Sequence, residues 1–246
     1  MLAKIPKFET KDIFKRVLEE DIFNKKFIYY KYFLDVQKKL IKKYDQKELI
    51  FKTHHFFGEL NNCIFTNDKT TLLFIYIIRD PREVLVSYAV HSGMSIDSIL
   101  DFFVSGQIMR KAKMESIVNW DIHYRSWKSF KSVPSMFIKF EDLLQNPKKN
   151  FHLLINFLSK YIDIKLNEKL LDETVELTRF DHLKKLESIY GFKEAKENNF
   201  FNSGKIDSWK KILNKEQITK VENKFYKEMN EELSELPFIK VQNFCI

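Results

Sequence analysis

The sequence predicts an α/β fold with a parallel sheet flanked by helices. Short apolar segments that suit strands alternate with amphipathic segments that suit helices, which is the pattern of such folds. The segment "TLLFIYII", residues 71–78, is apolar on both faces, as expected for a central strand covered by helices on each side. Three strand segments end in polar residues, "KTHH", "RDPRE" and "FEDLL". Ligands of parallel sheets bind beyond such strand ends, so these three segments are the candidate site.

The individual elements follow from apolar periodicity and from turn residues. We expect a largely helical stretch over 11–43, strands over 48–55, 71–78 and 135–140, and helices over 146–162 and 215–236. Asn214 and Gln217 have the spacing of a helix N-cap and its partner three residues later. One apolar face of the last helix is formed by Ile218, Val221, Phe225, Met229 and Leu233. Since no Gly/Ser-rich linker divides the chain, we predict a single domain over 1–246.

Charge and cysteine content limit the classes of function. The net charge of +8 suits an anionic ligand such as phosphate, sulfate, nucleic acid or a membrane surface, although a biased genome composition explains it equally well. Cys63 and Cys245 are too few and too far apart for a disulfide framework or a zinc pattern. The longest apolar run, Leu72 to Ile78, is too short to span a bilayer. We therefore predict a cytoplasmic location, without a membrane partner.

The strand end at "IIRDPRE" has the features of an anion site. Asp80 suits an N-cap, Pro81 suits the first helical position, and Glu83 completes a capping-box spacing. The N–H groups and dipole of the new helix favour an anion, and Arg79 adds a planar cation that fits phosphate oxygens. Ser87, two turns along, could donate to the same anion. The residues alone leave open the alternative that Arg79 pairs with a carboxylate and Ser87 only packs.

These residues carry a resemblance to a known family. The segment "RDPREVLVSY" resembles the 3′-phosphate-binding segment of the sulfotransferases that use 3′-phosphoadenosine 5′-phosphosulfate (PAPS), with an Arg and a Ser eight residues later. The resemblance implies that Arg79 and Ser87 bind the 3′-phosphate. Upstream, "FKTHH" resembles the family's Lys-Thr-His strand end, which implies that His54 is the catalytic base with Lys52 beside it. Along a strand, His55 would point to the opposite face.

Further segments resemble the family in the same order, from about Phe51 to Met229. "FIKFEDLLQNPKKNFHLLINFL" resembles its Tyr-Glu-Asp-Leu block, where Phe140 takes the place of the tyrosine beside the nucleotide. "LTRFDHLKKLE" resembles the segment that contacts adenine and implies that role for Thr178 and Phe180. "NWDIHYRSW" resembles a Trp and His pattern of bacterial members. The implied architecture is the P-loop-NTPase-like sulfotransferase fold.

The segment "FFNSGKIDSWKKIL" resembles the loop that closes over the 3′-phosphate, which implies binding roles for Asn202, Ser203, Gly204 and Lys205. It also departs from the family, because Asn202-Ser203-Gly204 stands where Arg-Lys-Gly or Arg-Ser-Gly is usual, which removes one or two cations. Each charged hydrogen bond lost there is worth about 1.5–3 kcal/mol, and Lys205 is the residue that would compensate in part. Phe140 likewise lacks the tyrosine hydroxyl.

The largest departure is at the amino terminus. The family begins with a strand and a Gly-containing Lys/Arg loop that wraps the 5′-phosphosulfate, and no such loop precedes "FKTHH". We therefore expect that strand and loop to be missing, and the chain to be N-terminally incomplete and a poor enzyme. Lys7 is the remaining candidate for the loop's cation.

The function that the resemblance implies is transfer of a sulfuryl group from PAPS, as co-substrate, to the hydroxyl or amine of a small-molecule or glycan acceptor. A neutral histidine has a suitable pKa to remove the acceptor proton, and the reaction needs no metal. Nucleic acid is not an expected partner. Two alternatives remain, a degenerate or truncated member that binds the nucleotide without catalysis, and a basic polyanion-binding protein. Trp120, Trp127 and Trp209 are expected to pack rather than to contact substrate.

Overall fold

The computed structural model describes residues 7–9, 33–44, 48–60, 62–105, 109–111, 115–117, 119–192, 200–201 and 204–235. Its strands are β1 (Lys7–Glu9), β2 (Ile50–Lys52), β3 (Glu59–Leu60), β4 (Cys63–Ile64), β5 (Phe74–Ile78), β6 (Met109–Lys111), β7 (Glu115–Ile117) and β8 (Ser135–Lys139). Pairs β1–β2 and β5–β8 are parallel, whereas β3–β4 and β6–β7 are antiparallel.

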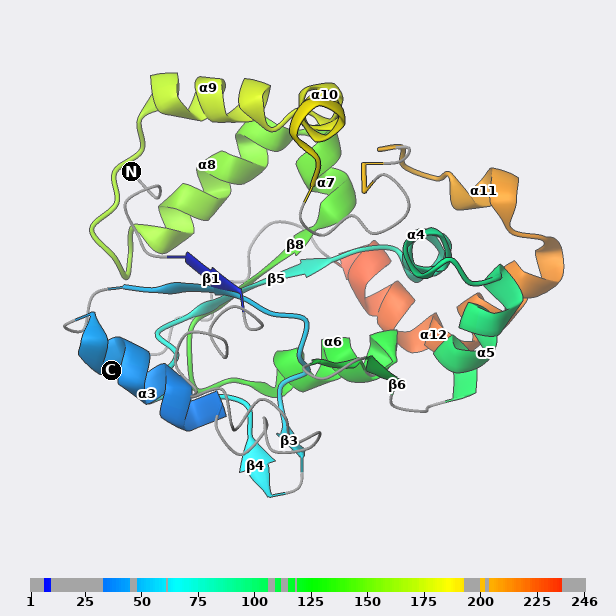
Figure 1. Ribbon diagram of the computed structural model, residues 1–246, viewed down its shortest axis with the longest axis horizontal. Helices are drawn as coiled ribbons and strands as arrows, with labels where there is room; N and C mark the ends of the chain where they lie inside the picture. Colours follow the sequence, from blue (N-terminus) through cyan, green and yellow to red (C-terminus); the bar gives the residue numbers. More distant parts are fainter. Residues whose placement is uncertain are drawn as a thin grey trace.

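Helices make up most of the remaining described chain. They are α3 (Phe33–Lys43), α4 (Pro81–Ser92), α5 (Ile96–Ser105), α6 (Trp120–Ser129), α7 (Phe140–Gln145), α8 (Pro147–Leu158), α9 (Glu168–Leu177), α10 (Phe180–Tyr190), α11 (Trp209–Ile212) and α12 (Lys215–Glu235). The parallel pair β5–β8 lies between α8 on one side and α6 on the other (Figure 1). Parallel strands with helices on both sides confirm the predicted α/β class.

The two faces of the β5–β8 pair are covered unequally. On the α6 side, Phe74 of β5 packs with Trp127 and Phe130 in one apolar cluster. On the α8 side, Met136 and Ile138 of β8 are buried with the apolar residues of α8. The neighbouring β5 residues on that side remain open, because Ile75 is 37% and Ile77 58% exposed. The prediction that 71–78 is buried on both faces is therefore wrong for one face, since α8 covers β8 but not β5.

A short strand precedes the "FKTHH" segment, contrary to the expectation that the N-terminal strand is missing. Lys7 opens β1, and the register pairs Lys7 with Ile50 and Glu9 with Lys52. The expectation failed because three residues are too few to show a strand periodicity in the sequence. The predicted helix over 11–43 is confirmed for α3, whereas residues 10–32 lie outside the described part of the chain.

The last helix, α12, begins at the predicted residue and has the predicted cap, but its backbone leaves helical geometry at Phe225 (φ −110°, ψ 16°), where the helix is kinked. The backbone N–H of Asn214 donates to Gln217 Oε1 at 3.0 Å, and the N–H of Gln217 donates to Asn214 Oδ1 at 2.9 Å, which is the reciprocal capping box. Val221, Phe225 and Met229 are buried against α4 and α5, as their spacing predicted, whereas the side chain of Leu233 lies outside the described residues. In the part of the chain that the structure describes, no helix combines the length and apolarity that a membrane span requires.

Candidate active site

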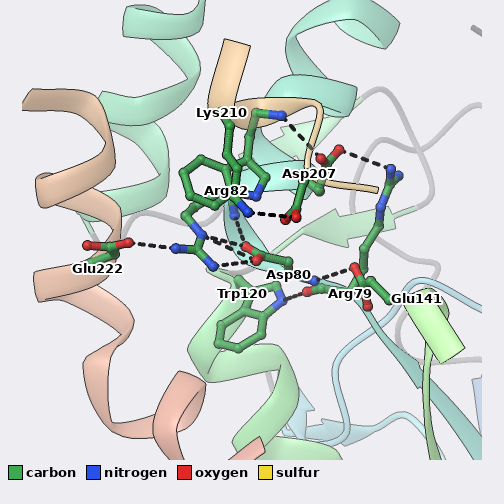
Figure 2. Close-up of polar contacts among 10 residues, drawn as sticks. Arg79, Asp80, Arg82, Trp120, Glu141, Asp207, Lys210 and Glu222 are labelled. Atoms are coloured by element: carbon green, nitrogen blue, oxygen red, sulfur yellow. Dashed lines mark hydrogen bonds and ion pairs between the residues drawn. The ribbon is translucent and has the colours of Figure 1, made fainter. Parts of the chain in front are cut away.

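Arg79 directly follows β5 and stands at the start of α4 (Figure 2). Its Nη2 donates to Glu83 Oε2 at 3.3 Å, and its Cζ lies 4.7 Å from the centre of the Phe140 ring. The Arg79 side chain is 25% exposed. Its Nε–H is buried and has no hydrogen-bond partner among the described residues. Arg79 therefore combines a carboxylate partner with unused donor capacity beside a helix N-terminus, where an anion is favoured.

The N-cap of α4 is built from two parts of the chain. Asp80 Oδ1 accepts from the Arg82 backbone N–H at 2.8 Å, as predicted. The reciprocal bond does not come from Glu83: the Asp80 N–H donates to Glu141 Oε1 at 3.1 Å, and Glu141 lies in α7 directly after β8. The capping-box role expected for Glu83 is thus wrong. Burial raises the pKa of the Glu141 carboxyl above its ordinary value, against the lowering effect of its backbone hydrogen bonds.

Glu83 instead joins α4 to the segment before α11. Its carboxylate is nearly buried, at 2% exposure for the residue. Oε2 accepts from the Ser208 hydroxyl at 2.8 Å as well as from Arg79, and Oε1 accepts from the Trp209 backbone N–H at 3.1 Å. Sequence patterns could not show this role, because Ser208 and Trp209 lie more than 120 residues away from Glu83 in the sequence. One carboxylate therefore links the predicted phosphate-binding arginine to the predicted closing loop.

Arg82 fixes the neighbouring helices around the same corner (Figure 2). Its Nη2 contacts Asp80 Oδ2 at 2.6 Å, and its Nη1 contacts Glu222 Oε1 of α12 at 2.6 Å. Its Cζ lies 3.9 Å from the centre of the Trp209 ring. Burial works against the charge of Arg82, but the hydrogen bonds and charges of Asp80 and Glu222 raise its pKa above the ordinary value. These contacts join the N-cap of α4 to α11 and α12, so the role of Arg82 at this corner is structural.

Two adjacent histidines follow β2, and one is exposed to solvent whereas the other is buried. His54 is exposed, whereas His55 is 1% exposed and packs between Phe33 and Phe65, at ring distances of 4.7 and 5.1 Å. This agrees with the expected alternation. The strand expected over 48–55 ends at Lys52, which is itself exposed, and the following residues are irregular. His54 is thus available to a ligand, although its role as the base stays a prediction.

His123 of α6 lies against the backbone of His54. The His123 Nε2 is 3.2 Å from the His54 carbonyl oxygen, and its Nδ1 is 2.8 Å from the Tyr76 hydroxyl of β5. Burial lowers the pKa of His123 to about 4, so the ring is neutral at physiological pH. No role was predicted for His123 from the sequence, although it lies in the segment "NWDIHYRSW" that resembles a family pattern.

One residue predicted to contact adenine, Phe180, lies against one residue of the predicted closing loop, Gly204. Phe180 opens α10, and a Cβ added to Gly204 would lie 2.4 Å from the Phe180 ring, so the Gly204 backbone is pressed against that ring. Gly204 has φ of +59°, a conformation that favours glycine. Lys205 is exposed beside it. Asn202 and Ser203 lie outside the described residues.

Thr178 and Ser87 have more ordinary surroundings. The Thr178 hydroxyl donates to the Thr174 carbonyl at 2.7 Å, at the C-cap of α9. Ser87 is exposed on α4, and its hydroxyl makes no hydrogen bond within the part of the chain that the structure describes. Both residues are accessible, and their nucleotide contacts stay predictions.

Glu187 of α10 is a further residue that sequence reasoning missed. It is 7% exposed, and its carboxylate accepts the backbone N–H groups of Phe200 and Phe201 at 2.5 and 3.0 Å. It therefore fixes the chain just before residue 202. An acidic residue on an amphipathic helix normally faces water, so the sequence contained no signal for this contact. Among the described residues, no group of three or more His, Cys, Asp and Glu side chains could hold a metal ion.

Relatives of the chain are named for sulfuryl transfer. Sulfotransferase 1B1 of Mus musculus is 23% identical over 170 residues, covering 63% of this chain and 54% of that protein. The amine sulfotransferase of Oryctolagus cuniculus is 22% identical over 182 residues, covering 67% of this chain and 56% of that protein. The chain thus spans about half the length of the curated relatives that it matches.

Solved structures share the fold. Mouse sulfotransferase SULT7A1 complexed with PAP aligns with a TM-score of 0.58 and 17% identity, over 78% of this chain and 69% of that one. Retinol dehydratase in complex with retinol and PAP aligns with a TM-score of 0.59 and 17% identity, over 97% of this chain and 73% of that one. These likenesses show that the expected sulfotransferase fold is present. The model of the sulfotransferase domain family matches residues 2–233, and the chain therefore belongs to that family.

Proposed function

We propose that the chain transfers a sulfuryl group from PAPS to the hydroxyl or amine of a small-molecule acceptor. The observation that carries this proposal is Arg79, whose buried Nε–H has no partner among the described residues and which stands at the N-terminus of α4. A phosphate oxygen there would meet the guanidinium and the first N–H groups of the helix. This supports binding of the 3′-phosphate, the group that distinguishes PAPS from other adenine nucleotides.

The remaining candidate residues would either bind the nucleotide or remove the acceptor proton. Phe180 and Gly204 would enclose the nucleotide from one side, and Lys205 would add charge to the 3′-phosphate. PAPS supplies the sulfuryl group and leaves as the 3′,5′-bisphosphate. His54 would remove the acceptor proton as the new bond forms, and its exposure supports access to that proton. A cytoplasmic location and a small-molecule acceptor stay predictions.

Calorimetric titration tests the phosphate site directly. The wild-type chain should bind 3′,5′-bisphosphoadenosine more tightly than AMP, and Arg79→Gln should lose most of this preference, about tenfold or more. Lys148→Gln is the matched control, because it removes the same charge from an exposed position on α8. Equal affinity of the wild type for both nucleotides would overturn the proposal.

A member that binds the nucleotide without catalysis is the second candidate. It is favoured by Phe140, whose ring contacts Arg79 but carries no hydroxyl. Transfer of labelled sulfuryl groups from PAPS to a panel of phenols and amines separates the two, because only the enzyme produces sulfated acceptor. A polyanion-binding protein would instead bind a polyanion with an affinity that falls steeply as salt rises, whereas binding in a nucleotide pocket would depend far less on salt.

A further inference from the structure

One face of α6 binds the irregular backbone that carries His54. His123 Nε2 contacts the His54 carbonyl oxygen at 3.2 Å, and Trp127 Nε1 donates to the His55 carbonyl at 2.8 Å. Ser126 completes the set, since its hydroxyl oxygen accepts the Phe57 backbone N–H at 3.0 Å. Residues three and four apart share a helix face, so the three side chains point to the same segment. They satisfy backbone N–H and C=O groups after β2 that a paired strand would otherwise satisfy, and the described chain has no such strand there.

The hydrogen bonds of His123 define its tautomer. A carbonyl oxygen can only accept, so Nε2 must carry the proton that points at His54 O. Nδ1 is then the acceptor, and the Tyr76 hydroxyl donates to it at 2.8 Å. Both nitrogens of the neutral ring are therefore occupied. A ring with neither nitrogen available is poorly suited to take a proton from an acceptor.

The same turn of α6 also reaches the phosphate corner. Trp120, three residues before His123, donates its Nε1–H to the Arg79 carbonyl at 3.0 Å. One helical turn thus holds the carbonyls of Arg79 and of His54, the residues expected to read the phosphate and to act as the base. The side chains that hold these two carbonyls lie three residues apart on α6, within a single helical turn.

We propose that His123 is a positioning residue for sulfuryl transfer, which fixes the His54 backbone through a neutral Nε2–H bond that Tyr76 orients. The proposal rests on the proposed function. It gives the second histidine of the site a task distinct from proton removal. In-line transfer needs the base at a fixed place, and small displacements from such a place cost up to about 100-fold in rate.

The variants His123→Ala and His123→Gln test this role. Alanine removes the bond to the His54 carbonyl, so kcat should fall about 10- to 100-fold with little change in the KM for PAPS. Glutamine can donate from its amide nitrogen and accept Tyr76 at its oxygen, so it should recover most of the loss. His152→Gln, on the surface of α8, is the matched histidine control. Loss of activity in His123→Gln equal to that in His123→Ala would show a proton-transfer role and overturn the proposal.

A second measurement does not depend on turnover. Nitrogen-15 NMR of the wild-type chain should show His123 neutral with its proton on Nε2, and His123→Ala should shift the ring resonances of His54. A proton on Nδ1, or an unchanged His54 in a folded His123→Ala chain, overturns the positioning role. If the wild type transfers no sulfuryl group to any acceptor, the proposed function fails instead, and the NMR result still decides whether His123 holds the His54 segment.

Discussion

Gly204 can lie against the Phe180 ring only because it carries a hydrogen atom where other residues carry Cβ. Its backbone is pressed onto the Phe180 ring, where an added Cβ would lie 2.4 Å from ring carbons. Gly93 has a similar positive φ of +67° but open space around its Cβ position. Substitution at either glycine incurs the left-handed backbone cost of about 1–2 kcal/mol. Only the one at Gly204 also displaces an aromatic ring.

We therefore expect Gly204→Ala to weaken binding of 3′,5′-bisphosphoadenosine, because Phe180 and the loop can no longer keep their contact. Gly93→Ala should lower stability by about 1–2 kcal/mol and leave nucleotide affinity unchanged. Calorimetric titration and urea unfolding of both variants check this pair. Equal effects of the two substitutions on affinity would show that Phe180 and Gly204 do not act together on the nucleotide.

His123 makes stability depend on pH in a defined window. Burial, opposed by its hydrogen bonds to backbone oxygens, lowers its folded pKa to about 4 from an ordinary value of 6.5. Between these values the unfolded chain binds more protons than the folded chain, so stability rises with pH. The contribution is complete above pH 6.5 and is lost as pH falls towards 4, an amount of about 3 kcal/mol.

His123→Gln should flatten this part of the stability profile, because glutamine does not titrate. Urea unfolding at a series of pH values from 7 to 4 measures the slope in both chains. The wild type should lose stability more steeply than the variant over this interval. Parallel slopes would mean that His123 titrates alike in the folded and unfolded chains.

At the scale of elements, Glu83 couples α4 to the start of α11. Glu83→Gln breaks the charge pair with Arg79 and turns an amide N–H towards one of the donors now held by the carboxylate. Loss of one partner of a buried pair costs about 3–5 kcal/mol, and the lower end applies because Arg79 is 25% exposed. The Trp209 amide should also exchange its hydrogen faster, since its acceptor is weakened.

Unfolding and hydrogen-exchange measurements check this prediction. Glu222→Gln is the control, because Glu222 is 43% exposed and its ion pair with Arg82 is worth at most about 1 kcal/mol. A Glu83 variant that is no less stable than the Glu222 variant would contradict the role of Glu83 in joining the two helices.

The sequence predicted those elements whose signals are local. The capping residues of α12 and its apolar spacing stand within one or two helical turns of each other, and the structure confirms both. Asp80 was likewise recognisable as an N-cap. Glu141, Glu83 and Glu187 were not, because each carboxylate accepts donors from another segment of the chain, 61, 126 and 13 residues away respectively, and a single sequence does not record such pairs. The family resemblance located the candidate site residues, whose ligand contacts stay predictions.

At the scale of the whole molecule, the β5–β8 pair has one incompletely covered face. Ile77 is 58% exposed, whereas its register partner Ile138 is 4% exposed beneath α8. Exposed apolar strand residues favour association between chains. The two isoleucines therefore form a natural pair of positions with the same strand geometry and opposite environments.

Ile77→Thr should reduce aggregation of this chain and binding of the dye ANS with little loss of stability, because threonine keeps the strand preference and adds a solvated hydroxyl. Ile138→Thr should cost about 1–3 kcal/mol, since it buries that hydroxyl. Light scattering and urea unfolding measure both. Unchanged scattering in Ile77→Thr would show that another surface drives association.

The hydrogen bonds from α6 to the backbone of Arg79 and His54 have a practical consequence for experiments. Trp120 and His123 hold Arg79 and His54 by their carbonyl oxygens, a group that every amino acid carries. Substitution of Arg79 or His54 therefore leaves the hydrogen bond to its backbone carbonyl in place. A variant at residue 54 presents its new side chain from an anchored backbone, so altered kinetics there report on chemistry rather than on a misplaced backbone. A variant at residue 79 keeps the same anchor but also loses the bond from Arg79 to Glu83. Residue 54 is therefore the more suitable of the two positions for a new reactive group.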